Sequence, residues 1–183
     1  MMKIKKPIAG LMFAALAMLW LQSCENDVLD ITESFTYENE FIVYSTDTVS
    51  TIVQTVDIAA QSSIISEYGN KIKSIEITGV TYWLTMHQGA DDQKIVEGHL
   101  RVSDVNDQGM AIIATISDVN LNQLVDNPEE LPVEQDGLDR MGKLIKNSPY
   151  SFKLIYSNAC NKGPLNFTVK FSYTIIMTAN PIK

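Results

Sequence analysis

The sequence predicts an all-β protein, a two-sheet antiparallel β-sandwich of immunoglobulin-like or related topology, with one or two short helices in its connections. Most of the chain after residue 36 alternates apolar and polar residues, which is the pattern of strands with one buried face. Turn-forming residues separate about seven such segments, and helical patterns are confined to the links between them. Short strands with one polar face each bury their other face when two sheets pack together.

One or two strands are expected between residues 41 and 58, at residues 41–45 and 51–56. A weaker helical pattern follows over residues 59–68 and ends at a glycine. Between residues 72 and 86 the apolar positions change from odd to even numbers, and Gly79 lies at the change. A bulge or bend at this glycine would place both apolar sets on one side of the sheet.

Three successive segments read as neighbouring strands. The alternation of residues 72–86 is repeated over residues 96–102 and 110–116, and turn-rich links at 88–92 and 104–109 separate the segments. The sequence therefore predicts an antiparallel meander of three strands. Under this interpretation the two links lie at opposite ends of the sheet.

Helical signals in the second half of the chain also lie between strands. A single helical turn is expected after Asn120, and residues 127–135, with two prolines and three glutamates, are expected to form a loop. Apolar residues at a spacing of about 3.6 predict a helix over residues 136–147. Asp136 is its expected N-cap, and a proline shortly after residue 147 stops it.

The clearest strand is the C-terminal segment, residues 165–177, in which every odd position is apolar and most even positions are polar. The same alternation occurs over residues 150–156. The link between them, residues 158–164, contains asparagine and glycine, which favour turns. These two strands are therefore predicted to form a hairpin.

The N-terminus has the features of an export signal. Lys3, Lys5 and Lys6 precede an uncharged apolar run over residues 8–21, which is the order of the basic and apolar regions in a secretory signal peptide. A stable spanning helix needs about 20 apolar residues. Because this run is shorter and polar, acidic sequence follows it directly, it is too short for a stable anchor.

The residues that close this run, Leu21-Gln22-Ser23-Cys24, resemble the lipobox of bacterial lipoproteins. Gln22 departs from the small or β-branched residue that is most common at its position. The resemblance implies cleavage before Cys24, diacylglycerol on its sulfur and an acyl chain such as palmitate on the new amine, which together make a stable anchor. The alternatives are a soluble secreted protein, or an uncleaved leader, with an incidental cysteine.

Acidic residues follow the cysteine at once. Glu25, Asp27 and Asp30 resemble the surface-export signal of lipoproteins in Bacteroidota, and this resemblance implies a lipid-anchored protein of the outer membrane, exposed at the cell surface. A short acidic linker would explain the same residues.

The expected division of the chain is a lipoprotein signal peptide at residues 1–23, an acidic tether at 24–36 and one β-sandwich domain at 37–183. The chain has 14 basic and 22 acidic residues, and removal of the leader takes away three lysines and no acid, which leaves a formal charge of −11. This balance argues against nucleic acid as a partner and against attraction to anionic lipid headgroups. The membrane is expected as a partner through the N-terminal lipid.

No catalytic, metal-binding or cofactor motif stands out, so we expect no enzymatic activity, no metal and no cofactor. The turn at residues 104–109 shares three positions with an EF-hand loop, but Thr115 stands where a bidentate glutamate is required, which favours a plain turn. His87 and His99 are expected at different heights on their strands, too far apart to share a metal. Cys160 has no disulfide partner within the chain once the lipobox cysteine is acylated.

Trp83 is the strongest candidate for a contact residue. Its position is odd, whereas the apolar residues from 80 to 86 are even, so it falls on the face that is expected to be wet. An exposed tryptophan often marks a contact surface. We therefore take Trp83 and its neighbour Tyr82 as candidate binding residues. The alternative is that the helix at 136–147 or a loop covers Trp83.

Two functional hypotheses fit these observations. The first is a lipid-anchored cell-envelope protein that acts as a non-catalytic binding or accessory module for a glycan or another envelope protein. The second is a structural subunit of a surface or pilus-like assembly, whose edge strands would pair with neighbouring subunits. The sequence leaves the ligand, the oligomeric state and the face of the membrane open.

Overall fold

A computed structural model describes residues 29–182. The signal peptide, Cys24 and the first residues of the expected tether lie outside this range. Strands dominate the described chain: β1 (Ile31–Ser45), β2 (Val49–Asp57), β3 (Ile72–His87), β4 (Lys94–Ser103), β5 (Ala111–Asn120), β6 (Glu129–Glu130), β7 (Ser151–Cys160) and β8 (Leu165–Ala179).

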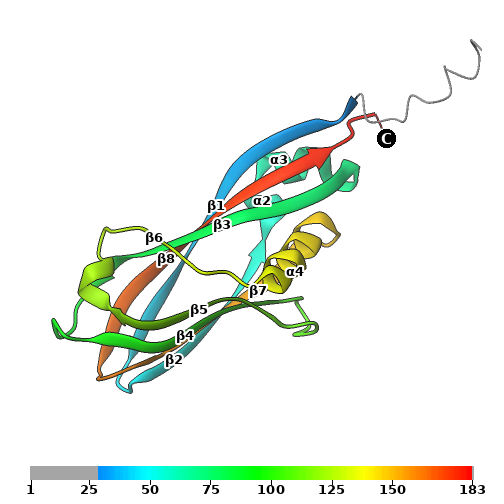
Figure 1. Ribbon diagram of the computed structural model, residues 1–183. Helices are drawn as coiled ribbons and strands as arrows, with labels where there is room; N and C mark the ends of the chain where they lie inside the picture. The colour runs from blue at the N-terminus through cyan, green and yellow to red at the C-terminus, as the bar shows by residue number, and fades with distance from the viewer. Residues whose placement is uncertain (1–28, 183) are drawn as a thin grey trace, which may run out of the picture.

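These strands form two antiparallel sheets (Figure 1). Sheet A has the order β1-β8-β3-β6, and sheet B has the order β2-β7-β4-β5. The pairing is nested, because β1 pairs with β8, β2 with β7, β3 with β6 and β4 with β5. The chain is thus one long hairpin whose strand pairs alternate between two sheets, which is an eight-stranded jelly roll. The predicted two-sheet antiparallel β-sandwich is confirmed, and its strands follow the jelly-roll order.

Two predicted strand pairings are wrong. The segments 150–156 and 165–177 become β7 and β8, which lie in different sheets, and β3 likewise does not pair with β4. Of the consecutive strands, β4 and β5 alone form a hairpin, and every other link between described strands crosses from one sheet to the other. Alternation shows which face of a strand is buried, but it does not show which strand lies beside it.

The expected tether is too long at its C-terminal end. β1 begins at Ile31, and residues 31–36 pair with the end of β8, from Ile31 opposite Ala179 to Thr36 opposite Thr174. Most side chains of this segment are exposed, with Phe35 partly buried. Backbone hydrogen bonds to β8 order the segment, and these leave no apolar pattern in the sequence. The sandwich therefore begins at residue 31 rather than 37.

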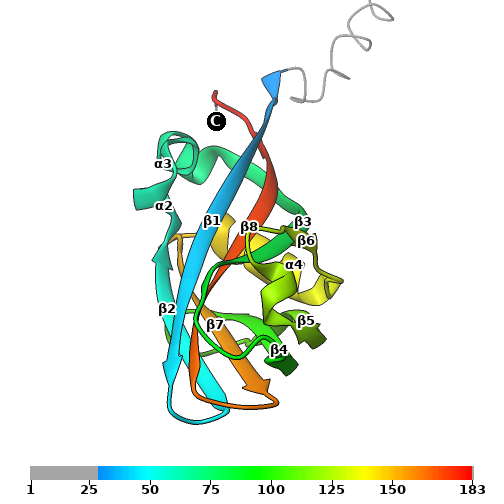
Figure 2. The same ribbon diagram turned by 90° about the vertical axis from the view of Figure 1, so that its left-hand side faces the viewer.

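Sheet A extends beyond sheet B. β1 and β8 have 15 residues and β3 has 16, whereas β4, β5 and β7 have 10. A register shift between Ile77 and Gly79 confirms the predicted bulge in β3. At the overhanging end, α2 (Ile58–Gln61) and α3 (Ser63–Tyr68) connect the sheets (Figure 2) and contribute Ile58 and Ile65 to the core.

The predicted helices form, with local differences. The pattern over residues 59–68 becomes α2 and α3, and Gly69 ends α3 with a φ of 44°. The turn after Asn120 is a 3-10 helix, η3 (Leu121–Leu124), and the Asn120 side chain accepts a hydrogen bond from the backbone of Asn122. The helix predicted at 136–147 is α4 (Gln135–Lys146), whose N-cap is Glu134, so Asp136 is not the cap. The expected loop at 127–135 contains the two-residue strand β6.

Helix α4 packs closely against both sheets along one side of the sandwich. A Cβ atom added at Gly137 would lie 1.9 Å from the carbonyl oxygen of Ile112 on β5, and one at Gly142 would lie 2.9 Å from that of Ile75 on β3. The absence of side chains at these two glycines lets the helix backbone approach both strands. No helix within residues 29–182 is long and apolar enough to cross a membrane.

Aromatic rings fill the middle of the core. Phe171 lies at their centre, with ring centroids 5.8 Å from Phe41, 6.3 Å from Tyr82 and 5.5 Å from Tyr156. Such separations are typical of favourable aromatic pairs. These rings come from β1, β3, β7 and β8, so the cluster holds the two sheets together.

Candidate functional site

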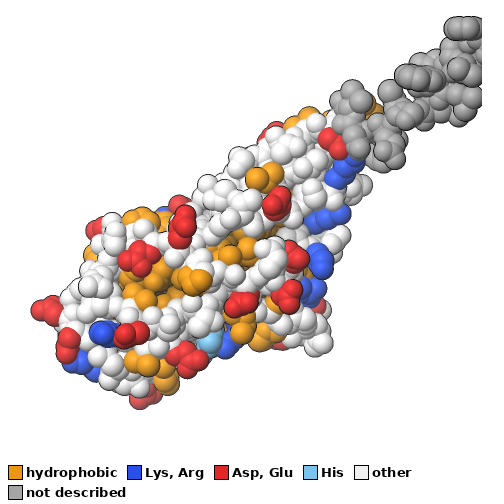
Figure 3. Space-filling view, viewed as in Figure 1, with side chains coloured by type: hydrophobic (Ala, Val, Ile, Leu, Met, Phe, Trp, Pro, Cys, Tyr) orange, Lys and Arg blue, Asp and Glu red, His pale blue; other side chains and the backbone are white. Residues whose placement is uncertain are grey.

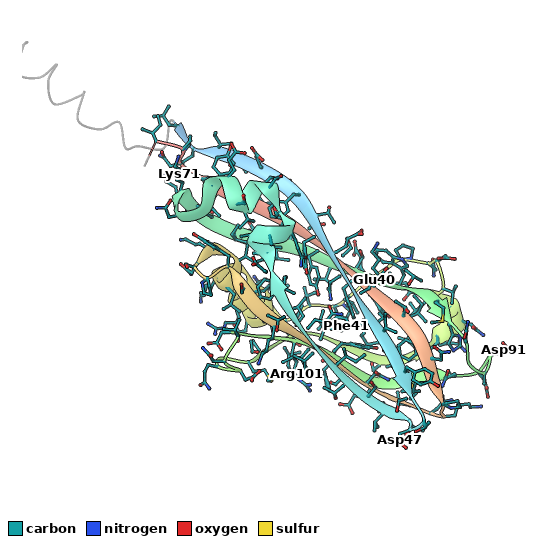
Figure 4. All side chains as sticks on the ribbon, turned by 180° about the vertical axis from the view of Figure 1, so that it is seen from behind. Glu40, Phe41, Asp47, Lys71, Asp91 and Arg101 are labelled. Carbon is teal, nitrogen blue, oxygen red and sulfur yellow. The ribbon has the colours of Figure 1, made fainter. Side chains whose placement is uncertain are left out.

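The candidate site lies on the outer face of sheet A. Buried Phe41 and exposed Glu40 occupy opposite faces of β1 (Figure 4), and even-numbered residues of β8 share the outer face with Glu40. Three rows of side chains cross the sheet from β1 through β8 toward β3. The first row is Glu40, Lys170 and Trp83, and the second is Ile42, Thr168 and Met86. The third is Tyr44 and Asn166, and Asn166 is hydrogen-bonded to Gln88. We name five of these residues the outer-face patch: Ile42, Tyr44, Trp83, Met86 and Lys170.

Lys170 connects the aromatic and charged parts of this surface. Its Nζ lies 5.3 Å from the centroid of the Trp83 ring and 2.6 Å from Oε2 of Glu38. The hydrogen bond to Glu38 raises the pKa of Lys170, so the ammonium stays charged beside the ring. Trp83 is half-buried on the outer face under this lysine. Helix α4 packs at the side of the sandwich, mainly on β3 and β5, and does not lie on this face.

Two further residues of the patch are more exposed than Trp83 and were missed by sequence reasoning. Ile42 is 70% exposed and Tyr44 is 79% exposed, and both lie on the edge strand β1. Between Ile42 and Met86, the outward-facing Thr168 is only 8% exposed. The parity argument that identified Trp83 would have found Ile42 and Tyr44, because both are even-numbered in a strand whose buried residues are odd.

Tyr82 does not belong to the site, and its choice as a binding residue was wrong. It is 3% exposed and faces the core, where its ring stacks on Phe171 at an interplanar angle of 17°. Burial, with a smaller contribution from Glu129, raises its pKa to about 12. Neighbouring residues of a strand face opposite sides of the sheet, so Tyr82 and Trp83 cannot both contact one ligand.

The histidines lie on different sheets and make hydrogen bonds within the protein. On β3, His87 Nδ1 lies 2.7 Å from Oδ1 of Asn122, and its Nε2 lies 2.9 Å from Oε1 of Gln93. On β4, His99 Nε2 lies 2.9 Å from Oε1 of Glu97. Within residues 29–182 no group of three histidine, cysteine or acidic side chains is placed to hold a metal ion.

The turn with partial EF-hand spacing is held by donors from the protein. Asp104 Oδ1 accepts hydrogen bonds from the backbone N–H groups of Asn106 and Gln108, at 2.9 and 2.8 Å. Arg140 on α4 donates to the carbonyl oxygens of Gln108 and Gly109. A hollow of about 410 Å³ lies between this turn and α4. Asp104 thus holds the turn itself, and Arg140 joins the turn to α4.

Cys160 is buried near the end of β7. The side-chain amide of Asn158 donates to its sulfur at 3.5 Å. Burial raises the pKa of the thiol, with a smaller opposing effect from this hydrogen bond. A buried, protonated thiol is a poor nucleophile, so Cys160 is a core residue.

Comparison with known proteins gives structural neighbours only. No protein-family model matches the chain, and no curated protein matches it. Similar solved structures include turnip yellow mosaic virus, at 14% identity and a TM-score of 0.39 over 82% of each chain. Desmodium yellow mottle tymovirus is 13% identical, with a TM-score of 0.35 over 81% of this chain and 89% of that one. The decameric BFDV capsid protein is 11% identical, with a TM-score of 0.34 over 81% and 98%.

Proposed function

We propose that this protein is a lipid-anchored component of the bacterial cell envelope and acts as a non-catalytic binding or accessory module. The proposal rests on the outer-face patch, where exposed Ile42 and Tyr44 and partly buried Trp83 and Met86 share one face with the Lys170–Glu38 ion pair. A partner that covers such side chains gains roughly 25 cal/mol for each Å² of apolar surface removed from water. The lipobox resemblance at Cys24 supports the location.

The ligand that fits this patch best is another envelope protein. Ile42 and Tyr44 project from an edge strand and suit an apolar contact, while Lys170 and Glu38 provide charges beside it. Protein interfaces combine an apolar centre, often with Tyr or Trp, and a polar rim. A glycan would instead stack on the rings of Tyr44 and Trp83, so the patch also suggests how a sugar ligand would bind.

Site-specific photo-cross-linking on intact cells tests the proposal. A photoreactive residue replaces Tyr44, and the matched control replaces Val53, which is 53% exposed on the outer face of sheet B. We expect a discrete protein adduct from position 44 and none from position 53. A carbohydrate adduct would change the ligand class. Identical adducts at both positions, or none at position 44, would contradict a binding role for the patch.

Lipid attachment needs a separate test. A Cys24→Ala variant is expected to take up no labelled palmitate and to be released from the membrane fraction, because the sulfur that would carry diacylglycerol is missing. Mutation of Cys160 is the matched control and should leave labelling unchanged. Normal labelling of the Cys24→Ala variant would exclude the proposed anchor.

The open edges of β1 and β2 favour a second candidate function, that of a structural subunit in a surface assembly. Each of these strands has one neighbour in its sheet, and β1 is 15 residues long. Unpaired backbone groups along such an edge can pair with a strand of another subunit. This role predicts oligomers that grow with protein concentration in detergent solution. A monomer at every concentration by analytical ultracentrifugation would contradict it.

A further inference from the structure

The described lysines divide into two groups by their charge partners. Within residues 29–182, five form ion pairs of 2.6–3.2 Å with acidic side chains: Lys73 with Asp30, Lys94 with Asp118, Lys153 with Asp107, Lys162 with Asp92 and Lys170 with Glu38. Lys71, Lys143 and Lys146 have no acidic partner within 4 Å in this part of the chain. These three lysines are therefore free to bind an anion.

The free lysines gather toward one end of the molecule. Lys143 and Lys146 lie in the last turn of α4, which packs on the first half of β3, and Lys71 immediately precedes β3. A shallow groove of about 220 Å³ between these elements is lined by Lys73, Lys143 and Lys146. Basic side chains follow this edge of the surface (Figure 3). Asp139 is an acidic side chain on the same groove, and it accepts a hydrogen bond from Gln135.

This end is also where the described chain begins. Lys71 lies near the start of β1, whereas Asp47 and Asp91 lie at the opposite end of the sandwich (Figure 4). Leu29 lies five positions after Cys24, and an extended chain covers at most about 3.6 Å per residue. A lipid on Cys24 would therefore hold this end within roughly 18 Å of the membrane surface.

Helix stability explains part of the pattern but not all of it. Positive charge in the last turn stabilises a helix through its dipole, which accounts for lysines at positions 143 and 146. It does not account for Lys71, which lies outside the helix, or for the groove shared with Lys73. Phosphate groups provide the compact anionic charge that several convergent lysines bind.

We propose that Lys71, Lys143 and Lys146, with the groove beside Lys73, bind phosphate groups of anionic lipids in the membrane that carries the protein. The inference rests on the proposed lipid anchor. The acidic charge expected to oppose headgroup binding belongs to the whole chain, whereas these lysines form a local basic surface. Each lysine near an anionic surface favours the bound orientation about fivefold. The lipid would then fix the distance of the domain from the membrane, and the lysines would fix its orientation.

Amine labelling of the full lipidated protein in vesicles tests the inference. The protein is reconstituted in phosphatidylcholine alone and in phosphatidylcholine with phosphatidylglycerol, and mass spectrometry then measures acetylation at each lysine. We expect labelling of Lys71, Lys143 and Lys146 to fall at least about threefold in the anionic vesicles, as expected from a fivefold preference per lysine. Lys94 and Lys162, at the far end, are the internal controls and should not change.

High salt and a variant sharpen the result. Raising the salt to 1 M shortens the screening length from about 8 Å to about 3 Å and should restore labelling. In a Lys143→Gln/Lys146→Gln variant, the protection of Lys71 should be lost, whereas Lys94→Gln/Lys162→Gln should keep it. Protein that floats with both vesicle types but shows equal labelling would overturn the inference and leave the anchor intact. Protein that floats with neither would contradict the anchor itself and with it the inference.

Discussion

The two long sides of the sandwich are closed in different ways. On one side, α4 and the segment before it join the sheets: Leu131 N–H donates to the carbonyl of Val80 in sheet A, and Glu134 N–H donates to that of Ile113 in sheet B. On the other side, β1 and β2 are both edge strands. In the middle of that side, Gln54 carries the side-chain hydrogen bonds, to the carbonyl of Glu40 and from Asn39.

Buried polar groups follow the same division. Four buried side-chain atoms within the described residues have no hydrogen-bond partner: Asn39 Oδ1, Tyr156 OH, Asn158 Oδ1 and Tyr173 OH. All four belong to β1, β7 and β8, on the half of the sandwich next to the open side. The buried amide of Gln93, which lies just before β4, instead donates to the carbonyls of Lys162 and Pro164 in the link between β7 and β8. The closed side is therefore the better satisfied one, and we expect it to dominate stability.

The largest loss of stability is expected when a methyl group is added at Gly137, on the closed side. In Gly137→Ala, the new Cβ would overlap the carbonyl of Ile112, and this backbone cannot move without shifting β5. We expect a loss of at least about 3 kcal/mol in the free energy of unfolding, despite a gain of about 1 kcal/mol from helix propensity. Urea denaturation measures the loss.

Two other glycines supply graded controls for that measurement. Gly142→Ala meets the carbonyl of Ile75 at 2.9 Å and should cost less than the change at position 137. At Gly79 nothing lies within 4 Å of an added Cβ, so Gly79→Ala should change stability by less than about 1 kcal/mol. Equal stability of the Gly137→Ala and Gly79→Ala variants would show that α4 does not hold the closed side.

Alkaline titration compares one tyrosine near each side. Tyr37 lies on the open-side strand β1, and Tyr82 lies on β3 where β3 pairs with β6. Burial raises the pKa of each to about 12. Because the folded pKa is above the ordinary value of about 10, burying the neutral phenols stabilises the fold fully below pH 10, and this contribution is lost as the pH rises to about 12.

Phenolate absorbance resolves the two groups when Tyr37→Phe and Tyr82→Phe variants are compared. If both phenols ionise near pH 12, the sides open together. A Tyr37 step clearly below the Tyr82 step would show that the open side loosens first. Ionisation of both near pH 10 would show that neither side protects its tyrosine, and the contrast between the sides would then be wrong.

Much of this architecture was predictable because period-two alternation records burial. It located the bulge at Gly79, the burial of odd-numbered residues in β8 and the outward-facing position of Trp83. It could not give strand order, since the alternation within β7 is the same whether its neighbour is β8 or β2. It gave no sign of the first residues of β1, where backbone pairing orders a polar segment. Ile42 and Tyr44 were also missed, although their even numbers place them on the outer face.

A smaller effect is expected on the open side from Gln54→Ala. The change removes the hydrogen bonds of Gln54 with the carbonyl of Glu40 and with Asn39. We expect a loss of about 1 kcal/mol in the free energy of unfolding, which is the typical net contribution of a hydrogen bond. Thr55→Ala, an exposed neighbour on the same strand, is the control. A loss above 3 kcal/mol would mean that Gln54 closes this side as firmly as α4 closes the other.

The smallest effect separates a satisfied phenol from an unsatisfied one. Tyr173 is fully buried and its hydroxyl has no hydrogen-bond partner within residues 29–182, whereas the hydroxyl of Tyr68 donates to Glu33 at 3.3 Å. Desolvating an unpaired hydroxyl costs free energy, so Tyr173→Phe should leave stability unchanged or raise it by up to about 1 kcal/mol. Tyr68→Phe should lower it by about 0.5 kcal/mol. If Tyr173→Phe were destabilising by more than Tyr68→Phe, the buried hydroxyl would have a partner, and the polar imbalance between the two halves would disappear.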